Sequence, residues 1–397
     1  MSTRFDPRRR ALTLGLTAAV AAPWAGLSLA STGRSDGRRF ILVVLRGGMD
    51  GLGAVPALGD PDFANARGAL ADFGTAALPL DATFALHPAL PQLHQLWARQ
   101  ELSVIHATGL SYRERSHFDG QQVLESGGTR PYELGTGWLG RALTASGGRG
   151  LALETAVPLV LRGREGVDTW APSSLPQPGL DLVSRLESLY AGDAMLAPAL
   201  ARARGLRDEA GAMASMRMNA GGGQAAVSAL ARKAADFIAL PNGPQAAVLS
   251  LGGWDTHTNQ APANGALTNA LRNLNALVQG LTEGLNASAG VWERTVVVVA
   301  TEFGREVAMN GTLGTDHGSG GAAFVFGGAV QGGRVIADWP GLAAAQRFQG
   351  RDLRVTTDLR ALFKGVLHDH LQIARATLDD SVFPGSKGMQ LGGLLRG

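Results

Sequence analysis

Residues 40–51 read FILVVLRGGMDG, a short apolar run that stops at an arginine and two glycines. A continuous apolar run of this length, bounded by a turn signal, is typical of a β-strand that is buried on both faces. The same pattern recurs at residues 102–106, 158–161, 246–251, 295–300 and 322–326. We therefore predict buried strands of one central sheet at all of these positions.

Amphipathic helices separate several of the predicted strands. Residues 267–285 carry apolar side chains at helical spacing, and residues 359–371 do so directly after Thr357 and Asp358, which are suitable capping residues. Strands that alternate with helices favour a mostly parallel sheet that is covered by helices on both faces. The predicted fold class is therefore a three-layer αβα protein of the α/β class with a mostly parallel central sheet.

Residues 168–223 break this rhythm. They contain a proline-rich loop at 172–178, a helical stretch rich in Ala, Met and Arg, and three glycines at 221–223. We interpret the segment as a helical insertion, and two ordinary surface helices are the alternative that the composition permits equally well.

The N-terminus resembles a twin-arginine export signal. Arg8, Arg9 and Arg10 precede an apolar stretch at 11–30 that ends in small residues. We predict a signal peptide at 1–30, a linker at 31–37 and one α/β domain at 38–397. The protein would then use the twin-arginine translocase and reside in the periplasm or outside the cell. A membrane anchor is the alternative, and the membrane would then be met only through an uncleaved signal.

Composition limits the chemistry of the domain. Outside residues 1–30 the basic and acidic residues are equal in number, and no basic run suggests a nucleic-acid partner. The chain contains no cysteine, so any metal must be bound through Asp, Glu, His or hydroxyl groups. These ligands favour a divalent cation such as Zn²⁺, Mn²⁺, Mg²⁺ or Ca²⁺.

Ligand-type side chains follow or precede the predicted strands almost one for one. They are Asp50, Asp255, His257, Glu302, Asp316 and His317. Each one alone is explained as well by a turn or a helix cap. Together they predict a metal site at the carboxyl edge of the sheet, because sites of this fold class are built from several strand ends.

Ser116 stands where a helix is predicted to begin. At a helix N-terminus the free N–H groups favour an anionic phosphate or sulfate group, so Ser116 is a candidate nucleophile. The alternative is that Ser116 only caps the helix, with Asp119 at the capping-box position.

The order of these motifs resembles the alkaline phosphatase and sulfatase superfamily. More closely, the chain from about residue 38 onwards resembles a twin-arginine-exported, sulfatase-related family, domain of unknown function 1501. The motifs that carry this resemblance are Met49-Asp50-Gly51, Arg115-Ser116-His117-Phe118, Gly253-Trp254-Asp255-Thr256-His257, Thr301-Glu302-Phe303-Gly304-Arg305 and Asp316-His317-Gly318.

The resemblance implies an alkaline phosphatase-like sheet and a role for each motif residue. Asp255, His257 and His317 resemble the ligands of one metal. Asp50, Ser116 and Glu302 resemble the ligands of a second, with Ser116 as the nucleophile.

Phe303 departs from this pattern, because the phosphatases have a histidine there. His117 or Asp316 is the expected replacement as ligand, and loss of the second metal site is the alternative. His117, Arg46 and Arg115 are further candidate catalytic residues, with an arginine binding the anionic group of the ester substrate.

The resemblance therefore implies an exported metal-dependent hydrolase of phosphate or sulfate esters. Formylglycine chemistry is excluded, since the chain has no signature of the Cys-x-Pro-x-Arg type. The alternative is a non-catalytic member that binds a metal, a glycan or a partner protein.

Overall fold

The computed structural model describes residues 37–396, apart from 74–75, 164–165, 173–179, 212–222 and 261–263. The predicted signal peptide at 1–30 lies outside the described residues. Within the described part, no helix combines the length and the apolar character that are needed to cross a membrane.

A nine-stranded sheet forms the centre of the molecule, with strand order β10-β4-β9-β8-β1-β7-β5-β6 and β11 paired with β4. The strands are β1 (Arg39–Leu45), β4 (Leu102–Gly109), β5 (Gly150–Ala152), β6 (Val167–Thr169), β7 (Ala246–Leu251), β8 (Thr295–Thr301), β9 (Gly321–Phe326), β10 (Arg334–Ile336) and β11 (Thr357–Asp358). A separate hairpin pairs β2 (Leu78–Pro79) with β3 (Ala85–Leu86). All pairings in the large sheet are parallel except those of β9, which runs antiparallel to β4 and to β8. The predicted mostly parallel sheet is confirmed.

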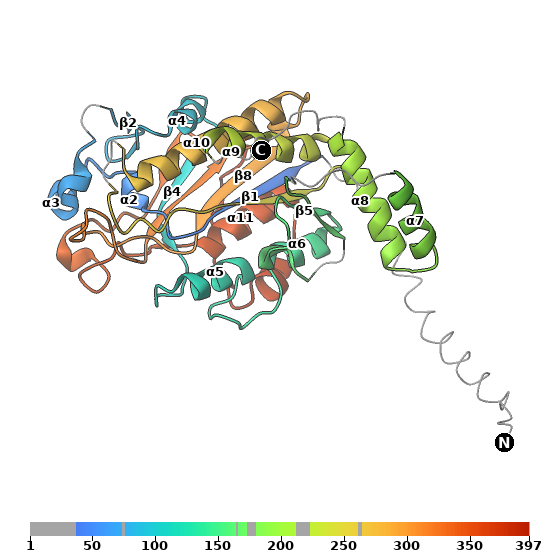
Figure 1. The fold of residues 1–397 in the computed structure, drawn as a ribbon. Helices are drawn as coiled ribbons and strands as arrows, with labels where there is room; N and C mark the ends of the chain where they lie inside the picture. Colours follow the sequence, from blue (N-terminus) through green and yellow to red (C-terminus); the bar gives the residue numbers. More distant parts are fainter. Residues whose placement is uncertain are drawn as a thin grey trace, which may run out of the picture.

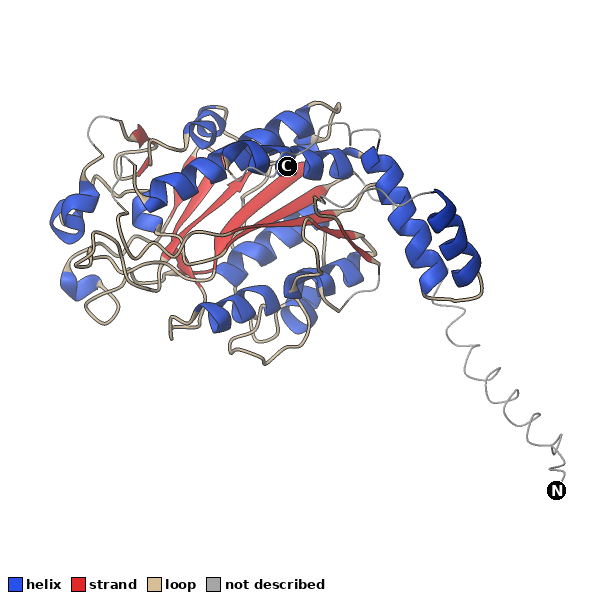
Figure 2. Cartoon of the chain, in the orientation of Figure 1, coloured by secondary structure: helices blue, strands red, loops and turns tan. Residues whose placement is uncertain are grey.

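Helices cover both faces of the sheet, as Figures 1 and 2 show. The helices are α2 (Gly51–Ala54), α3 (Phe63–Arg67), α4 (Pro91–Ala98), α5 (His117–Ser126), α6 (Trp138–Ser146), α7 (Leu180–Tyr190), α8 (Leu196–Gly211), α9 (Gln224–Ala239), α10 (Ala266–Asn286), α11 (Leu359–Leu371) and α12 (Arg375–Thr377). Helices α4, α9 and α10 pack on one face, and α5, α6 and α11 pack on the other. This arrangement confirms the predicted three-layer α/β class.

Strand β1 shows why the sheet needs two helical layers. Its side chains alternate between the two faces, as in any β-strand. Ile41, Val43 and Leu45 join the core on the side of α10, while Phe40, Leu42 and Val44 join the core on the side of α11. Because both sets are apolar, neither face of the strand can be left in water.

The strand predicted at 158–161 is wrong. Leu159–Leu161 form a 3₁₀ turn, although Val160 and Leu161 are fully buried. A short apolar run reports burial, and it does not distinguish a strand from a buried turn. The edge of the sheet is built instead by β5 and β6, which are too short to produce a clear apolar run.

The segment predicted as a helical insertion at 168–223 begins inside the sheet, because Asp168 belongs to β6. The helices α7 and α8 that follow lie to one side of the sheet layers (Figure 1). The remaining elements agree closely with the sequence analysis. In particular, Asp358 caps α11 by accepting a hydrogen bond from the Arg360 N–H at 2.8 Å.

Candidate metal centre

Five loops meet at one edge of the sheet. Strands β1, β4, β7 and β8 run in the same direction, so the loops at 46–50, 110–117, 252–257 and 302–305 leave from the same edge. Strand β9 is antiparallel, and therefore the segment at 316–320 reaches this edge before its strand begins. The topology thus explains why Asp316 and His317 precede a strand while the other ligand-type residues follow one.

Three side chains form a compact triangle at this edge. The Nε2 atoms of His117 and His317 lie 2.9 Å apart, and the Asp255 Oδ1 atom lies 3.1 Å from the second and 3.3 Å from the first. The ligand atoms of these three residues all lie within 4.8 Å of one another, so one metal ion could contact all three. The triangle is therefore the candidate metal centre.

His257 adjoins this triangle along one of its edges. Its Nε2 atom lies 2.9 Å from Asp255 Oδ1 and 3.0 Å from His317 Nε2. The structure thus brings together Asp255, His257 and His317, as the sequence analysis expected, and adds His117.

The other ring nitrogen of each histidine faces an oxygen acceptor. His117 Nδ1 lies 2.8 Å from Glu302 Oε1, and His257 Nδ1 lies 3.1 Å from Asp316 Oδ1. His317 Nδ1 lies 2.9 Å from the backbone carbonyl of Arg115. Because these oxygens accept hydrogen bonds, the neutral rings carry their hydrogen on Nδ1 and direct the Nε2 lone pair toward the centre.

This geometry fits a divalent cation. Two imidazole lone pairs that face each other at 2.9 Å repel unless a proton or a cation lies between them. A tetrahedral Zn²⁺ with bonds of about 2.0 Å has ligand atoms about 3.3 Å apart. The edges of the triangle are at or slightly below that length, so the three atoms can bind one ion after a small expansion.

The charges in the centre are consistent with ligand roles. Burial raises the pKa of Asp255, but the contacts with Arg305 and His317 outweigh this effect and bring the pKa to about 2. The guanidinium of Arg305 is fully buried and donates to Asp255 Oδ1 at 2.7 Å. The hydrogen bond to Glu302 raises the pKa of His117 above its ordinary value. Asp255 is thus a carboxylate at neutral pH.

Glu302 and Asp316 hold a different place from the one that the sequence suggested. Both were predicted as metal ligands, and in the structure each contacts the far nitrogen of an imidazole. The Glu302 carboxylate is fully buried, and its Oε1 atom also accepts from the Gly47 N–H at 2.8 Å and from Gln121 Nε2 at 3.2 Å. These contacts are those of a group that orients a ligand histidine.

Asp50, also predicted as a ligand, is engaged elsewhere. The side chain is buried and accepts hydrogen bonds from Arg67 and Gln260 through Oδ2. Its Oδ1 atom caps α2 by accepting from the Gly53 N–H at 3.1 Å. Its two oxygen atoms therefore serve a buried ion pair and a helix cap.

Ser116 is the N-cap of α5, as one of its two predicted roles required. Its hydroxyl accepts a hydrogen bond from the Asp119 N–H at 3.4 Å. The residue is partly exposed, and it stands between Arg115 and His117, which both contact His317. A substrate at the triangle would therefore meet the first turn of α5.

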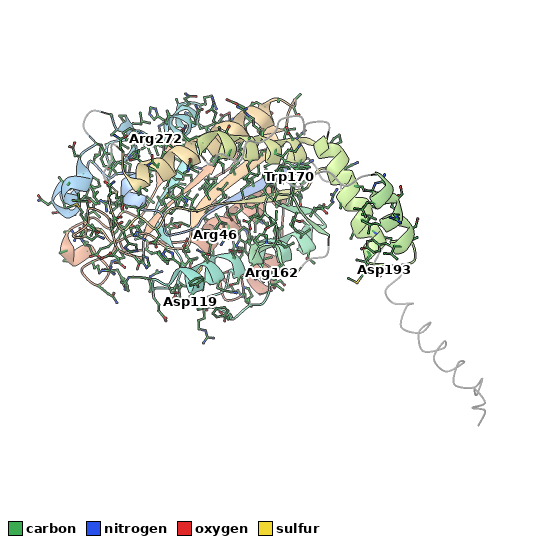
Figure 3. The ribbon with its side chains drawn as sticks, in the orientation of Figure 1. Arg46, Asp119, Arg162, Trp170, Asp193 and Arg272 are labelled. Atoms are coloured by element: carbon green, nitrogen blue, oxygen red, sulfur yellow. The ribbon has the colours of Figure 1, made fainter. Side chains whose placement is uncertain are left out.

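The two candidate arginines are both bound to carboxylates. Arg46 lies between the sheet and α5 (Figure 3), where it donates to Glu125 at 2.7 Å and to Gln121 at 3.0 Å. Arg115 donates to Asp352 through Nε at 2.9 Å. Arg46 retains 27% of its side-chain exposure, so it can still meet an anionic group.

Phe303 closes the centre on its buried side. Its ring packs against His117 and His317, with centroid distances of 4.7 and 5.2 Å. Phe303 itself offers no ligand atom, and the additional imidazole of the cluster is that of His117, the first residue of α5.

Sequence reasoning missed several supporting residues. Gln121 follows His117 by four positions, which places both on one face of α5, so helical spacing could have indicated it. Asn310 donates to Asp316 at 3.1 Å and to the His257 carbonyl at 2.9 Å from an irregular loop, for which no local pattern gave a signal.

Comparisons with solved structures return distant similarities. One is the C-terminal periplasmic domain of EcEptC from Escherichia coli in complex with Zn, at 12% identity over 88% of this chain and 87% of that chain, with a TM-score of 0.43. A second is the phosphonate monoester hydrolase of Agrobacterium radiobacter, at 11% identity over 85% and 74%, with a TM-score of 0.41. A third is a protein in the alkaline phosphatase superfamily from Vibrio parahaemolyticus, at 11% identity over 76% and 63%, with a TM-score of 0.39. Similarity at this level does not transfer an activity.

Comparison of the sequence with known proteins and families identifies the family of the chain. No curated protein matches the chain at a significant level. The profile of one family, described as protein of unknown function (DUF1501), matches residues 80–380. This match spans well over half of the chain and confirms the resemblance that the motifs indicated. The chain therefore belongs to the DUF1501 family.

Proposed function

We propose that the protein is an exported metal-dependent hydrolase of phosphate or sulfate esters. The observation that carries the proposal is the triangle of His117, Asp255 and His317, in which each imidazole is oriented by an acceptor at its Nδ1 atom. Three protein ligands leave one position of a tetrahedral zinc ion open, as in catalytic zinc sites, so the proposal requires that His257, whose Nε2 atom lies 3.0 Å from His317 Nε2, does not occupy that position.

The donor set favours Zn²⁺ among the divalent cations. Two imidazoles and one carboxylate suit zinc, whereas Mg²⁺ and Ca²⁺ prefer sites made of oxygen atoms. A bound cation would supply polarisation of an ester oxygen and would lower the pKa of a hydroxyl group held beside it.

Ser116 is the proposed nucleophile. Its hydroxyl oxygen attacks the phosphorus or sulfur atom, the bond to the ester oxygen breaks, and the serine proton leaves with the released alcohol. Water then attacks the same phosphorus or sulfur atom of the serine ester, the bond to the serine oxygen breaks, and phosphate or sulfate is released as the serine regains its proton. The first N–H groups of α5 and the exposed part of Arg46 would bind the anionic group during this step. Ser116 is suited to this role because it lies at the start of α5 and is partly exposed.

A non-catalytic role as a metal-dependent binding protein is the second candidate. It is favoured by Phe303, which fills the position where the phosphatase pattern has a histidine, and by the hydroxyl of Ser116, which caps α5. On this view the metal would shape a surface for a glycan or a partner protein.

One experiment separates the two candidates. The purified protein is freed of metal with a chelator, reloaded with Zn²⁺, Mn²⁺, Mg²⁺ or Ca²⁺, and assayed against a phosphate monoester, a phosphate diester and an aryl sulfate. The hydrolase proposal expects turnover of at least one substrate with Zn²⁺ or Mn²⁺ and none after chelation. A protein that binds metal and hydrolyses none of these esters supports the binding role.

Export is the remaining part of the proposal, and it rests on the arginine motif and the apolar stretch within residues 1–30. Replacing residues 8–10 by lysine keeps the positive charge and removes the guanidinium groups, so the precursor is expected to remain in the cytoplasm. Cell fractionation measures this, and an unchanged periplasmic level of the variant would show that the protein uses another route.

A further inference from the structure

Asp352 is a fully buried carboxylate that no motif of the sequence analysis included. Its Oδ2 atom accepts from Arg115 Nε at 2.9 Å and from the Ser319 hydroxyl at 2.7 Å, and its Oδ1 atom lies 3.3 Å from Arg351 Nη1. A buried charge is tolerated only when it is paired and hydrogen-bonded, so these three contacts hold Asp352 and its partners in one arrangement.

Each partner of Asp352 either contacts His317 or lies close to it in the chain. The backbone carbonyl of Arg115 accepts from His317 Nδ1 at 2.9 Å. Arg351 donates through Nη2 to the backbone carbonyl of His317, also at 2.9 Å. Ser319 lies two residues after His317 in the same segment. Asp352 thus contacts one residue that binds the backbone of His317 and another whose carbonyl binds its ring.

The backbone around Asp352 reinforces this connection. Asp352 pairs with Glu306, and the neighbouring Arg305 pairs with His317 across an antiparallel bridge. Arg305 in turn donates to Asp255, so the same ladder reaches a second member of the triangle. Backbone pairing thus connects the segment of Asp352 to the segment 305–306, which pairs with His317 and carries the arginine that contacts Asp255.

We propose that Asp352 is a positioning residue of the metal centre: it fixes Arg115, Ser319 and Arg351 so that His317 presents Nε2 to the cation. The proposal rests on the metal centre of the proposed function and is independent of whether the centre hydrolyses esters. Groups that orient a metal ligand from outside the coordination shell commonly change metal affinity by about 10–100-fold when they are altered.

The test compares Asp352→Asn with Asp168→Asn. Asp168 is a matched control, because it is also a buried carboxylate in an ion pair, with Arg149 at 2.9 Å. It lies in β6, at the far edge of the sheet. The affinity of each purified protein for Co²⁺ is measured by chelator competition, and the visible absorption bands of bound Co²⁺ report the coordination geometry. Thermal unfolding of the metal-free proteins measures how far each substitution destabilises the fold.

We expect Asp352→Asn to weaken Co²⁺ binding by about tenfold or more and to alter the absorption bands, while Asp168→Asn leaves both unchanged. Wild-type affinity and wild-type bands in Asp352→Asn would overturn the proposal and leave the metal centre intact. A wild-type protein that binds no Co²⁺ would overturn the metal centre and this proposal with it.

A second variant keeps the test decisive if Asp352→Asn does not fold. Arg351→Gln alters a side chain that is 31% exposed, and it removes the contact with the His317 carbonyl. We expect it to weaken Co²⁺ binding by about threefold or more, since one of the contacts that hold His317 is lost. An affinity equal to that of the wild type would overturn the proposal.

Discussion

Replacing Glu302 by glutamine tests whether this residue orients a ligand or is itself a ligand. Glutamine has the same shape, and the structure predicts how its amide would be placed. The Oε1 position accepts from His117, Gly47 and Gln121, so the amide oxygen belongs there. The amide NH₂ group then faces the Thr301 hydroxyl, which can turn its own hydrogen to the carbonyl of Leu45 at 2.8 Å.

The substitution therefore removes a charge while the surrounding donors and acceptors remain paired. We expect the free energy of unfolding of the metal-free protein to fall by about 1 kcal/mol or less. Metal affinity is expected to fall by about 10–100-fold, because His117 loses the carboxylate that makes its ring a stronger ligand. This corresponds to about 1.4–2.8 kcal/mol of binding free energy.

Competition with a chromophoric zinc chelator measures the affinity. Glu125→Gln is the matched control, since Glu125 is a buried carboxylate of the same helix as His117, paired with Arg46 and hydrogen-bonded to the Val160 N–H at 3.0 Å. An unchanged affinity in Glu302→Gln would refute the orienting role. Complete loss of metal would instead show that Glu302 is a ligand, as the sequence first suggested.

Three further predictions concern other parts of the chain. Asp50→Asn leaves the buried Arg67 without its charge partner, so the free energy of unfolding, measured with heat and with denaturant, should fall by about 3–5 kcal/mol. The metal content should not change, and a lower metal content would show that Asp50 is a ligand. Ser116→Ala should abolish ester turnover, keep the metal and lose about 1 kcal/mol from the helix cap, whereas retained turnover would refute the serine mechanism. Burial lowers the pKa of His106 to about 4, so the unfolded chain binds a proton at this residue more readily than the folded protein. The free energy of unfolding of the wild type should therefore fall by up to about 3 kcal/mol as the pH falls from 6.5 to 4. Unfolding of His106→Gln, measured at both pH values, should not show this part of the loss.

The strands that form the middle of the sheet were predictable from the sequence. The runs at 40–45, 246–251 and 295–300 are apolar at every or nearly every position, because strands in the middle of a parallel sheet have no face in water. The short strands β5, β6 and β10 could not be found in this way. Each has three residues, and their place in the sheet depends on their neighbours and not on a pattern of their own.

The membership of the candidate site was also largely predictable, since ligand-type residues at strand ends meet wherever the strands are parallel. The role of each residue was not. Whether Glu302 contacts a cation or the far nitrogen of His117 depends on the position of α5, which the sequence does not specify. Asp50 follows its strand as expected, and it is drawn away by Arg67, a partner that only the packed structure reveals. Asp352 has no local signal, because its importance comes from contacts with residues distant in the chain.

The central claim is that His117, Asp255 and His317 bind a divalent cation. Its most direct test is the metal content of the protein, measured by mass spectrometry after purification without chelators, for the wild type and for His317→Ala. We predict about one zinc or manganese ion per wild-type chain and little or none in the variant, because His317 Nε2 is the atom that contacts the ligand atoms of His117, His257 and Asp255. A wild-type protein without a divalent cation, or a variant with the same content as the wild type, would contradict the claim.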